Sequence, residues 1–204
     1  MFLRGQNLMN VFNEAEFRDL CKRLGAEGTI RDVTVRYPTS GYFNRVRNVV
    51  RHDRRGEVVF CVIRPDGKAI MTRRNDYPEN VYRIPTGGIG HGEDVVDAVF
   101  REVREELGLE VRIRDFAGVV RIRFEHGNEH VMFYSYIFIL DEIGGRLLAD
   151  ASDDEISEIK EVDLEEFEQA VRALGSIGGK WQDWGKFRCI TSNAVLNYLK
   201  HKSI

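Results

Sequence analysis

Three glutamates stand close together in the segment REVREELG: Glu102, Glu105 and Glu106 occupy positions i, i+3 and i+4. On a helix this spacing places three like charges on one arc, where they repel one another. Arg101 can pair with Glu105 at i+4, but one guanidinium does not neutralise three carboxylates. A divalent cation does, and hard oxygen ligands on a rigid element suit Mg²⁺ or Mn²⁺, which share phosphate oxygens with a substrate. We therefore hypothesise a metal site here, with a plainly solvated acidic face as the alternative.

The helix that carries these acids is predicted by an apolar stripe beside them. At about 100° per residue, the stripe consists of Val96, Val99, Phe100, Val103 and Leu107. Asp94 is expected near the first turn, where the helix dipole favours an anion, and Gly108 at the end, where a left-handed residue terminates many helices. The stripe packs on a core, so the glutamates lie at the edge of that core.

A run of glycines, GGIGHG at residues 87–92, precedes this helix. The glycines permit a tight turn. Gly87 and Gly92 have the spacing of the phosphate loop of nucleotide triphosphatases, but Glu93 stands where that loop requires lysine. Glu93 also occupies the place of the third glycine in the dinucleotide-binding fingerprint. The sequence therefore excludes both of these phosphate-binding motifs.

Gly87, Glu93 and the run REVREELGL at residues 101–109 have the order and spacing of the Nudix box. Five residues separate Gly87 from Glu93, and seven separate Glu93 from Arg101. These residues match every fixed position of the box, and the strands around it extend the likeness over about residues 45–165. The chain therefore resembles the Nudix hydrolase family.

The resemblance implies an α/β fold, an α/β/α sandwich with a mixed β-sheet and the loop-helix, plus an N-terminal extension. It also implies metal-dependent hydrolysis of a pyrophosphate bond by water attack on phosphorus, with Mg²⁺ or Mn²⁺ as cofactor. The expected substrate is a nucleoside diphosphate linked to another moiety, such as a nucleotide sugar, an ADP-ribose-like compound or a nucleoside triphosphate, and no residue selects among them. The alternative is a Nudix-fold module that binds or senses a nucleotide without catalysis.

The resemblance further implies that four carboxylates form the metal site: Glu93, Glu102, Glu105 and Glu106. Glu102, Glu105 and Arg101 are the predicted catalytic residues, with Arg101 orienting Glu105 through a charge-assisted hydrogen bond. Gly87 and Gly88 bring main-chain amides close to the metal cluster and the substrate. These roles are expectations that follow from the family's motif.

The group that takes the proton of the attacking water is left open. Glu102 is one candidate. Four other acids lie on or near loops downstream of the box: Glu125, Glu129, Glu155 and Glu158. For each of these four, the alternative is an exposed loop acid without a catalytic role.

Two further groups of side chains are candidates for substrate contacts. Arg121 and Arg123 alternate on a predicted strand after the helix and can reach a phosphate, unless they belong to a solvated strand face. Trp181, Trp184 and Phe187 can stack on a nucleobase, as aromatic side chains do. Packing of the last helix on the sheet is the alternative for these three.

Composition limits the class of protein. The chain has 204 residues, of which 43% are hydrophobic and 31% charged, as in ordinary globular proteins. A net charge of -3 gives no general reason to expect nucleic-acid or anionic-membrane binding, and no apolar run is long enough to cross a bilayer. The three cysteines are far apart and odd in number, which fits a reducing compartment. We expect a cytoplasmic protein.

Apolar spacing predicts the remaining elements. Helices are predicted over residues 13–24, 93–107, 164–174 and 184–198. Strands are predicted over residues 29–52, with breaks at Pro38 and Gly41, and over residues 56–64, 69–74, 81–84, 116–124, 131–140 and 156–162. The first helix is expected to lie outside the main core.

The first fifty residues are more than the smallest Nudix fold requires. We therefore divide the chain into an N-terminal helix and strand extension, residues 1–50, and a Nudix domain that ends in a C-terminal helix, residues 51–204. In longer members of the family, added strands build a homodimer that completes the substrate pocket. A homodimer is the favoured assembly here, and packing of the extension on its own chain is the alternative.

Overall fold

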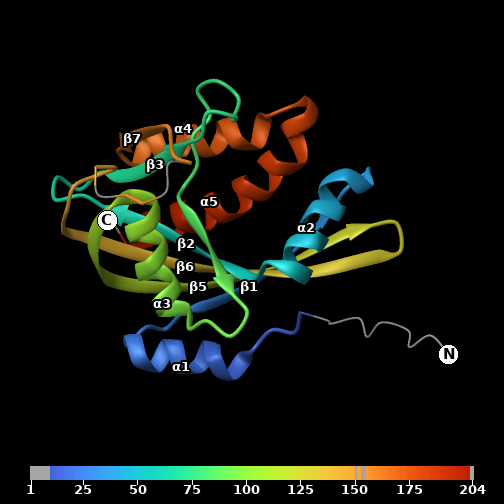
Figure 1. Ribbon diagram of the computed structural model, residues 1–204, viewed down its shortest axis with the longest axis horizontal. Coiled ribbons are helices and arrows are strands. Elements are labelled where there is room, and N and C mark those ends of the chain that lie inside the picture. Colours follow the sequence, from blue (N-terminus) through green and yellow to red (C-terminus); the bar gives the residue numbers. More distant parts are fainter. Residues whose placement is uncertain (1–9, 150, 153–154, 203–204) are drawn as a thin grey trace.

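A computed structural model describes residues 10–149, 151–152 and 155–202 of the chain, so the first nine residues of the predicted extension lie outside it. Within the described ranges, seven strands form one mixed sheet in the order β1-β5-β6-β2-β3-β7, with β4 paired to β2 (Figure 1). The strands are β1 (Thr29–Arg36), β2 (Arg54–Ile63), β3 (Ala69–Arg73), β4 (Thr86–Gly90), β5 (Leu109–His126), β6 (Glu129–Gly145) and β7 (Glu158–Val162). The helices are α1 (Glu14–Leu24), α2 (Ser40–His52), α3 (Val95–Glu102), α4 (Leu164–Ser176) and α5 (Gln182–Lys202).

Helices cover both faces of this sheet, because the central strands are apolar on both sides. Along β2, Val59 and Cys61 face the core formed with α2, α4 and α5, whereas Val58 and Phe60 face the core formed with α1 and α3. β2 runs parallel to β6, and such doubly buried strands need cover on each face. The predicted α/β/α sandwich with a mixed sheet is confirmed.

The prediction for residues 29–52 is half right. β1 is a strand, and it pairs in parallel with β5 of the same chain, but residues 40–52 form helix α2 and not a strand. The buried residues of α2 are Phe43, Val46 and Val50. Their spacing of i, i+3 and i+7 fits a helical stripe better than the period of two that we took for a strand. The predicted strand over 81–84 is reduced to one isolated bridge, between Thr72 and Arg83.

The first helix is confirmed, but its expected position outside the main core is wrong. α1 begins after Asn13, whose side chain accepts a hydrogen bond from the Glu16 amide, as expected of a cap. Leu20 is only 1% exposed and packs in the core beneath α3. The apolar side of this short helix therefore closes one face of the sheet.

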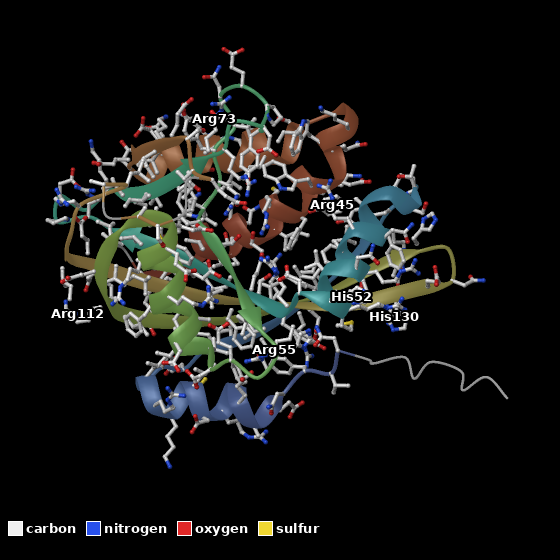
Figure 2. The ribbon with its side chains drawn as sticks, viewed as in Figure 1. Arg45, His52, Arg55, Arg73, Arg112 and His130 are labelled. Carbon is white, nitrogen blue, oxygen red and sulfur yellow. The ribbon has the colours of Figure 1, made fainter. Side chains whose placement is uncertain are left out.

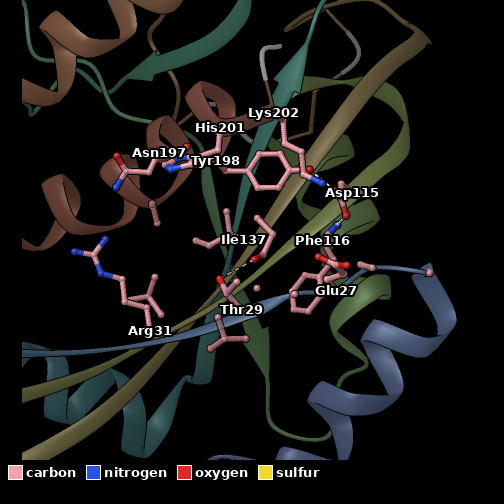
Figure 3. Close-up of a pocket in the computed structure, with 18 residues that line it drawn as sticks. Glu27, Thr29, Arg31, Asp115, Phe116, Ile137, Asn197, Tyr198, His201 and Lys202 are labelled. Carbon is pink, nitrogen blue, oxygen red and sulfur yellow. Dashed lines mark hydrogen bonds between the residues drawn. The ribbon is translucent and has the colours of Figure 1, made fainter.

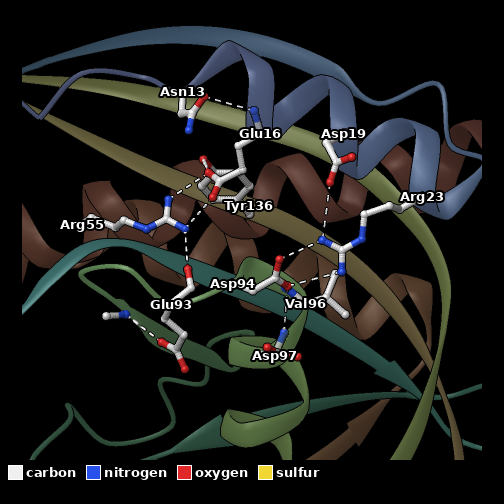
Figure 4. Close-up of polar contacts among 11 residues, drawn as sticks. Asn13, Glu16, Asp19, Arg23, Arg55, Glu93, Asp94, Val96, Asp97 and Tyr136 are labelled. Atoms are coloured by element: carbon white, nitrogen blue, oxygen red, sulfur yellow. Dashed lines mark hydrogen bonds and ion pairs between the residues drawn. The ribbon is translucent and has the colours of Figure 1, made fainter.

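Ion pairs fasten the N-terminal extension to the start of α3 (Figure 4). Arg55, on β2, donates to both carboxylate oxygens of Glu16 at 2.7 and 2.9 Å and to the carbonyl of Glu93 at 2.8 Å. Arg23, on α1, donates to Asp94 at 2.8 Å. Three segments far apart in sequence thus meet at the loop that precedes α3.

No helix in the described ranges is long and apolar enough to cross a membrane.

Candidate active site

The turn from β4 into α3 is built by the box residues themselves. Gly92 has a φ of +85°, a conformation that suits glycine. The Glu93 carboxylate accepts a hydrogen bond from the Gly90 amide at 2.7 Å, and Asp94 caps the helix by accepting from the amides of Val96 and Asp97. Asp94 therefore serves as the helix cap. These bonds fix where α3 begins and how its acids face.

After Glu102 the helix changes to a π-helical turn, Val103–Leu107, which ends at Gly108 with a φ of +68°. A π-turn is wider than an α-turn, so successive side chains rotate less about the axis, and such turns are frequent at functional sites. Val103 and Leu107 are fully buried, as predicted. The wider turn sets the directions of Glu105 and Glu106, which lie between them. A helix with about 100° per residue does not predict this turn.

Arg101 is the centre of the acidic cluster. Its Nε donates to Glu93 at 2.7 Å, its Nη1 donates to Glu102 at 2.8 Å and to Glu105 at 2.9 Å, and its Nη2 donates to the Gly88 carbonyl at 2.8 Å. The predicted pair between Arg101 and Glu105 is present. The planar fork of Arg101 also reaches Glu93 and Glu102, which the sequence did not predict.

The carboxylate of Glu102 packs directly on Gly87. A Cβ atom placed on Gly87 would lie 2.1 Å from the Cδ of Glu102, so only glycine leaves room for this carboxylate. Burial raises the pKa of Glu102 above the ordinary range of a glutamate, and the hydrogen bond from Arg101 opposes that rise. For Glu93 the hydrogen bonds from Arg101 dominate, and its pKa is lowered.

One cavity of about 550 Å³ brings several of the box residues together, although Glu93 and Arg101 are not in its wall. Its walls contain Gly87 and Gly88 and the three glutamates of the helix: Glu102, Glu105 and Glu106. The donor set, carboxylate oxygens beside main chain at a pocket wall, has the chemistry that Mg²⁺ or Mn²⁺ requires. Across the ranges that the structure describes, however, no three acidic, histidine or cysteine side chains are arranged to hold a metal ion. The donor types fit a cation, and Arg101 holds their present arrangement.

Aromatic side chains also line this cavity. The three that were predicted, Trp181, Trp184 and Phe187, are all in its wall, together with Tyr42 and Tyr77. Trp184 and Phe187 are 7% and 4% exposed, so packing of α5 accounts for most of their surface. Trp181 is more exposed and meets the Tyr77 ring edge-on at 5.9 Å between centroids. Packing of the last helix, the alternative, therefore accounts for Trp184 and Phe187, and stacking on a nucleobase stays a prediction.

Five arginines in the cavity wall were not predicted from the sequence: Arg45, Arg54, Arg74, Arg83 and Arg188. They come from α2, β2, the segment between β3 and β4, and α5, and no local motif joins them. Arg188 donates to the buried carboxylate of Glu57 at 2.8 Å, and that carboxylate also accepts from the Ser135 hydroxyl. Arg188 and Glu57 therefore form a buried, charge-compensated pair.

Arg83 is held in a different way. It is 6% exposed, and it donates to the Tyr77 hydroxyl at 2.8 Å, to the Ile84 carbonyl at 3.0 Å and to the Thr86 hydroxyl at 3.1 Å. All three acceptors are neutral, and among the described residues no carboxylate forms an ion pair with Arg83. A buried cation without a counter-charge at a cavity wall favours an anionic ligand.

Arg121 and Arg123 do not join this site. Arg121 forms a bidentate pair with Asp32 of β1 at 2.7 Å, and Arg123 donates to Glu125 at 2.6 Å. Neither arginine is in the wall of the cavity that holds the glutamates. The structure therefore does not bring these two predicted contacts to the box residues.

The candidates for the general base lie in different parts of the structure. Glu155 is in the cavity wall with Glu102 and forms an ion pair with Arg74. The other three are paired outside that wall: Glu125 with Arg36 and Arg123, Glu129 with Arg47, and Glu158 with Arg73 and Tyr82. Of the five candidates, the structure therefore places Glu102 and Glu155 in the wall of this cavity.

A second cavity, of about 570 Å³, lies near the end of α5 (Figure 3). Its walls come mainly from β1, β5 and α5, and across it the Tyr198 hydroxyl donates to Asp115. None of the described residues that line it belongs to the box or to the predicted contacts. Its volume is close to that of the first cavity, but its lining residues do not have the same chemistry, so the candidate site is the cavity with the glutamates.

The sandwich, the loop-helix and the glutamate-lined cavity together define a Nudix domain. The sequence profile of the NUDIX domain family matches residues 53–181, more than half of the chain, so the chain belongs to this family. A solved NUDIX hydrolase from Nitrosomonas europaea has the same fold: the TM-score is 0.51 at 15% identity, covering 72% of this chain and 88% of that one.

Two curated relatives are similar over shorter stretches. An ADP-ribose pyrophosphatase from Methanocaldococcus jannaschii is 36% identical over 89 residues, which are 43% of this chain and 52% of that protein. An RNA pyrophosphohydrolase from Pelagibacter ubique is 34% identical over 62 residues, 30% of this chain and 39% of that protein. The similarity thus spans about half, or less, of the length of these relatives.

Proposed function

We propose that the protein is a metal-dependent pyrophosphohydrolase that cleaves a nucleoside diphosphate linked to another moiety by water attack on phosphorus. The observation that carries this proposal is the cavity whose wall combines Glu102, Glu105 and Glu106 with arginines and aromatic rings. Carboxylates suit a cation, arginines suit phosphates and aromatic rings suit a base. The names of the two curated relatives support a pyrophosphate as the bond that is cleaved.

In this mechanism the chain's own residues orient the carboxylates and activate the attacking water. Arg101 holds Glu102 and Glu105 on one side of the cavity, so their oxygens stay pre-oriented without a search of rotamers. Glu102 or Glu155 accepts the proton of the attacking water. A bound Mg²⁺ or Mn²⁺ supplies charge neutralisation for the phosphate oxygens and lowers the pKa of that water. Trp181 and Tyr77 offer ring surface to a nucleobase.

A second candidate function is a module that binds a nucleotide without turning it over. The specific observation in its favour is the arrangement of the acids: Arg101 bonds to Glu93, Glu102 and Glu105, and the described residues contain no ready-made cluster of metal ligands. If this arrangement persists when nucleotide binds, the cavity can hold a ligand without hydrolysing it.

A substrate panel separates the two functions. ADP-ribose, nucleotide sugars, nucleoside triphosphates and a 5′-triphosphorylated oligoribonucleotide are each incubated with Mg²⁺ or Mn²⁺, and the products are resolved by chromatography. Turnover of one class, abolished by a chelator and with heavy-oxygen label from water in a phosphoryl product, supports the hydrolase. Tight binding of one ligand with no product under any metal supports the module and contradicts the hydrolase.

The proposal also includes a cytoplasmic homodimer. β1 lies at the edge of the sheet, where a second copy can add a strand, although β1 itself pairs with β5 of its own chain. Light scattering coupled to gel filtration of the full chain measures the mass directly. A monomer mass at micromolar concentration would contradict the dimer and leave the catalytic proposal unchanged.

A further inference from the structure

A β-bulge in β2 turns Arg54 toward the cavity. Glu57 faces α5, so simple alternation would turn Arg55 toward that same face and Arg54 away from it. The register between β2 and β4 shifts between Arg54 and Gly56, and this reverses the two directions. Arg55 (Figure 2) instead points toward α1, where it binds Glu16. Arg54 enters the cavity wall. Bulges beside active sites commonly re-aim a side chain in this way.

The guanidinium of Arg54 lies against Gly88. A Cβ atom placed on Gly88 would be 2.8 Å from the Cζ of Arg54 and 2.9 Å from its Nε and Nη1. Gly88 is opposite Glu57 in the ladder and shares its face, whereas Gly87 is opposite Val58 and faces α3. The two adjacent glycines therefore support opposite charges on the two faces of β4: the Glu102 carboxylate on Gly87 and the Arg54 guanidinium on Gly88.

Arg54 is available to an anion. Its carboxylate partner is Asp53, the preceding residue, and the two side chains are 36% and 53% exposed, so this pair contributes little. Its Nη1 has no hydrogen bond to any residue that the structure describes. Arg83 binds Thr86 on the same face of β4, two residues from Gly88, or about 6 to 7 Å along the strand. Two guanidinium groups thus follow one face of β4.

We propose that Arg54 binds the diphosphate of the substrate from the side opposite the glutamates, with Gly88 providing the space in which its guanidinium lies. This inference rests on the proposed function, because it concerns the same cavity. Arg54 would compensate charge on the phosphate oxygens that the carboxylate side does not reach, and its forked N–H groups match two oxygens of one phosphoryl group. It is a substrate-binding residue that the box does not contain.

Binding of a diphosphate that cannot be cleaved tests Arg54 without relying on turnover. Titration calorimetry with α,β-methylene-ADP compares the wild-type chain with Arg54→Gln, Arg54→Lys and the control Arg51→Gln. Arg51 is an exposed arginine of α2 outside the candidate site's wall. Arg54→Gln is expected to weaken binding about tenfold to a hundredfold. Arg54→Lys is expected to lie between, and Arg51→Gln to match the wild type; adenosine affinity is expected to be the same in all four.

A second variant tests the geometry. Gly88→Ala puts a Cβ where the guanidinium lies, and the far end of a flexible side chain can move aside, so the fold is retained. Gly88→Ala is expected to weaken binding as much as Arg54→Gln, and to have no further effect when Arg54 is already glutamine. Fully additive losses would overturn the role assigned to Gly88.

The outcomes separate this inference from the proposed function. If the wild-type chain binds the methylene analogue and Arg54→Gln binds it equally well, Arg54 is not a diphosphate ligand and the proposed function stands. If the wild-type chain binds neither this analogue nor any substrate of the panel, the proposed function and the inference both fail. A loss confined to Arg54→Gln and Gly88→Ala establishes the contact.

Discussion

Arg101 is the side chain on which the acidic cluster depends. It bonds to three carboxylates and one carbonyl, and these four acceptors come from the strand, the turn and the helix of the box. A lysine has one point charge and cannot reach that set from one position. An arginine within the same helix therefore offsets the repulsion between these like charges, and any bound cation must fit beside that arginine.

Substitution of Glu105 or Glu106 by glutamine tests the proposed metal site. Each variant is expected to lower turnover by several orders of magnitude with folding intact, because a neutral amide is a poorer Mg²⁺ ligand. Binding of Mn²⁺, followed by electron paramagnetic resonance, is expected to weaken in parallel. Glu165→Gln, at an exposed position on α4, is the matched control. Turnover near the wild-type rate in Glu105→Gln or Glu106→Gln would refute the assignment of that residue.

Gly87→Ala tests the contact between that glycine and Glu102. The added methyl group would overlap the Glu102 carboxylate, so the carboxylate must leave its place beside Arg101. We expect turnover to fall by about a hundredfold, as a displacement of about 1 Å can cause. Gly90→Ala is the control, because its new Cβ would meet Glu93 at 3.4 Å, an ordinary contact. Equal turnover in the two variants would show that the packing of Glu102 on Gly87 does not matter.

The site residues that could be predicted are those that are close in sequence. The glutamates, Arg101 and the glycines share one turn and one helix, so their spacing alone brings them together. The cavity arginines come from four segments, and only the folded chain shows that Arg54 and Arg188 meet the same space. For Arg121 the sequence showed an arginine on a strand but not which neighbour it has, and Asp32 on β1 takes it.

Among the elements, α2 shows why the local apolar pattern led to a wrong prediction. Residues 40–52 contain apolar residues that fit a period of two over short windows and a helical stripe over the whole segment. Pro38 ended β1 as expected, but the segment after it was long enough for a helix. The π-turn after Glu102 could not be predicted either, because it depends on how Val103 and Leu107 pack and on the stop at Gly108.

Asp94 connects two elements, and its substitution is expected to change stability in two steps. Asp94→Ala removes the cap of α3 and is expected to cost about 1 kcal/mol of the free energy of unfolding. Asp94→Asn keeps a capping oxygen and loses only the charge that faces Arg23, so its cost at neutral pH is expected to be smaller. Urea unfolding measures the free energy of unfolding of both variants. An Asn variant as unstable as the Ala variant would contradict the division of the effect into a cap and a charge.

The same residue gives a pH dependence with a definite sign. The hydrogen bond from Arg23 and those from the helix amides lower the pKa of Asp94. Its contribution to stability is therefore present above the unfolded pKa of an aspartate, about 4, and is lost as the pH falls through the lower folded value. Asp94→Asn has no carboxylate there, so the gap between wild type and variant is expected to narrow in acid. A gap that is constant with pH would contradict this.

At the scale of the whole molecule, the N-terminal extension helps to form the wall of the candidate site. β1 pairs with β5 from Thr29 to Arg36, α1 is bonded to the start of α3, and α2 contributes Tyr42 and Arg45 to the cavity wall. The NUDIX family match begins at residue 53, so these contributions come from residues outside the matched range. The shape of the cavity therefore depends on residues that the family motif does not include.

The sequence predicts a division of the chain at residue 50. The contacts between the two parts, however, predict that they unfold in a single transition. Phe43, on α2, is fully buried in the same core as residues of β2, β6 and α5. Phe43→Ala is therefore expected to destabilise the whole molecule by about 3 to 5 kcal/mol. Urea unfolding is followed by circular dichroism and by tryptophan fluorescence, and the two unfolding curves are expected to shift equally. Both tryptophans, Trp181 and Trp184, lie beyond residue 50 but line the cavity that α2 helps to close.

Val11→Ala is the control for that experiment, because Val11 is 71% exposed and its truncation is expected to leave both curves in place. If Phe43→Ala moved only the circular dichroism curve, or split it into two steps, residues 1–50 would unfold independently of the Nudix domain. In that case α2 would form a movable wall of the cavity. A single shared shift instead means that the extension and the glutamate cluster are folded as one body, so a change in α2 reaches the site through the common core.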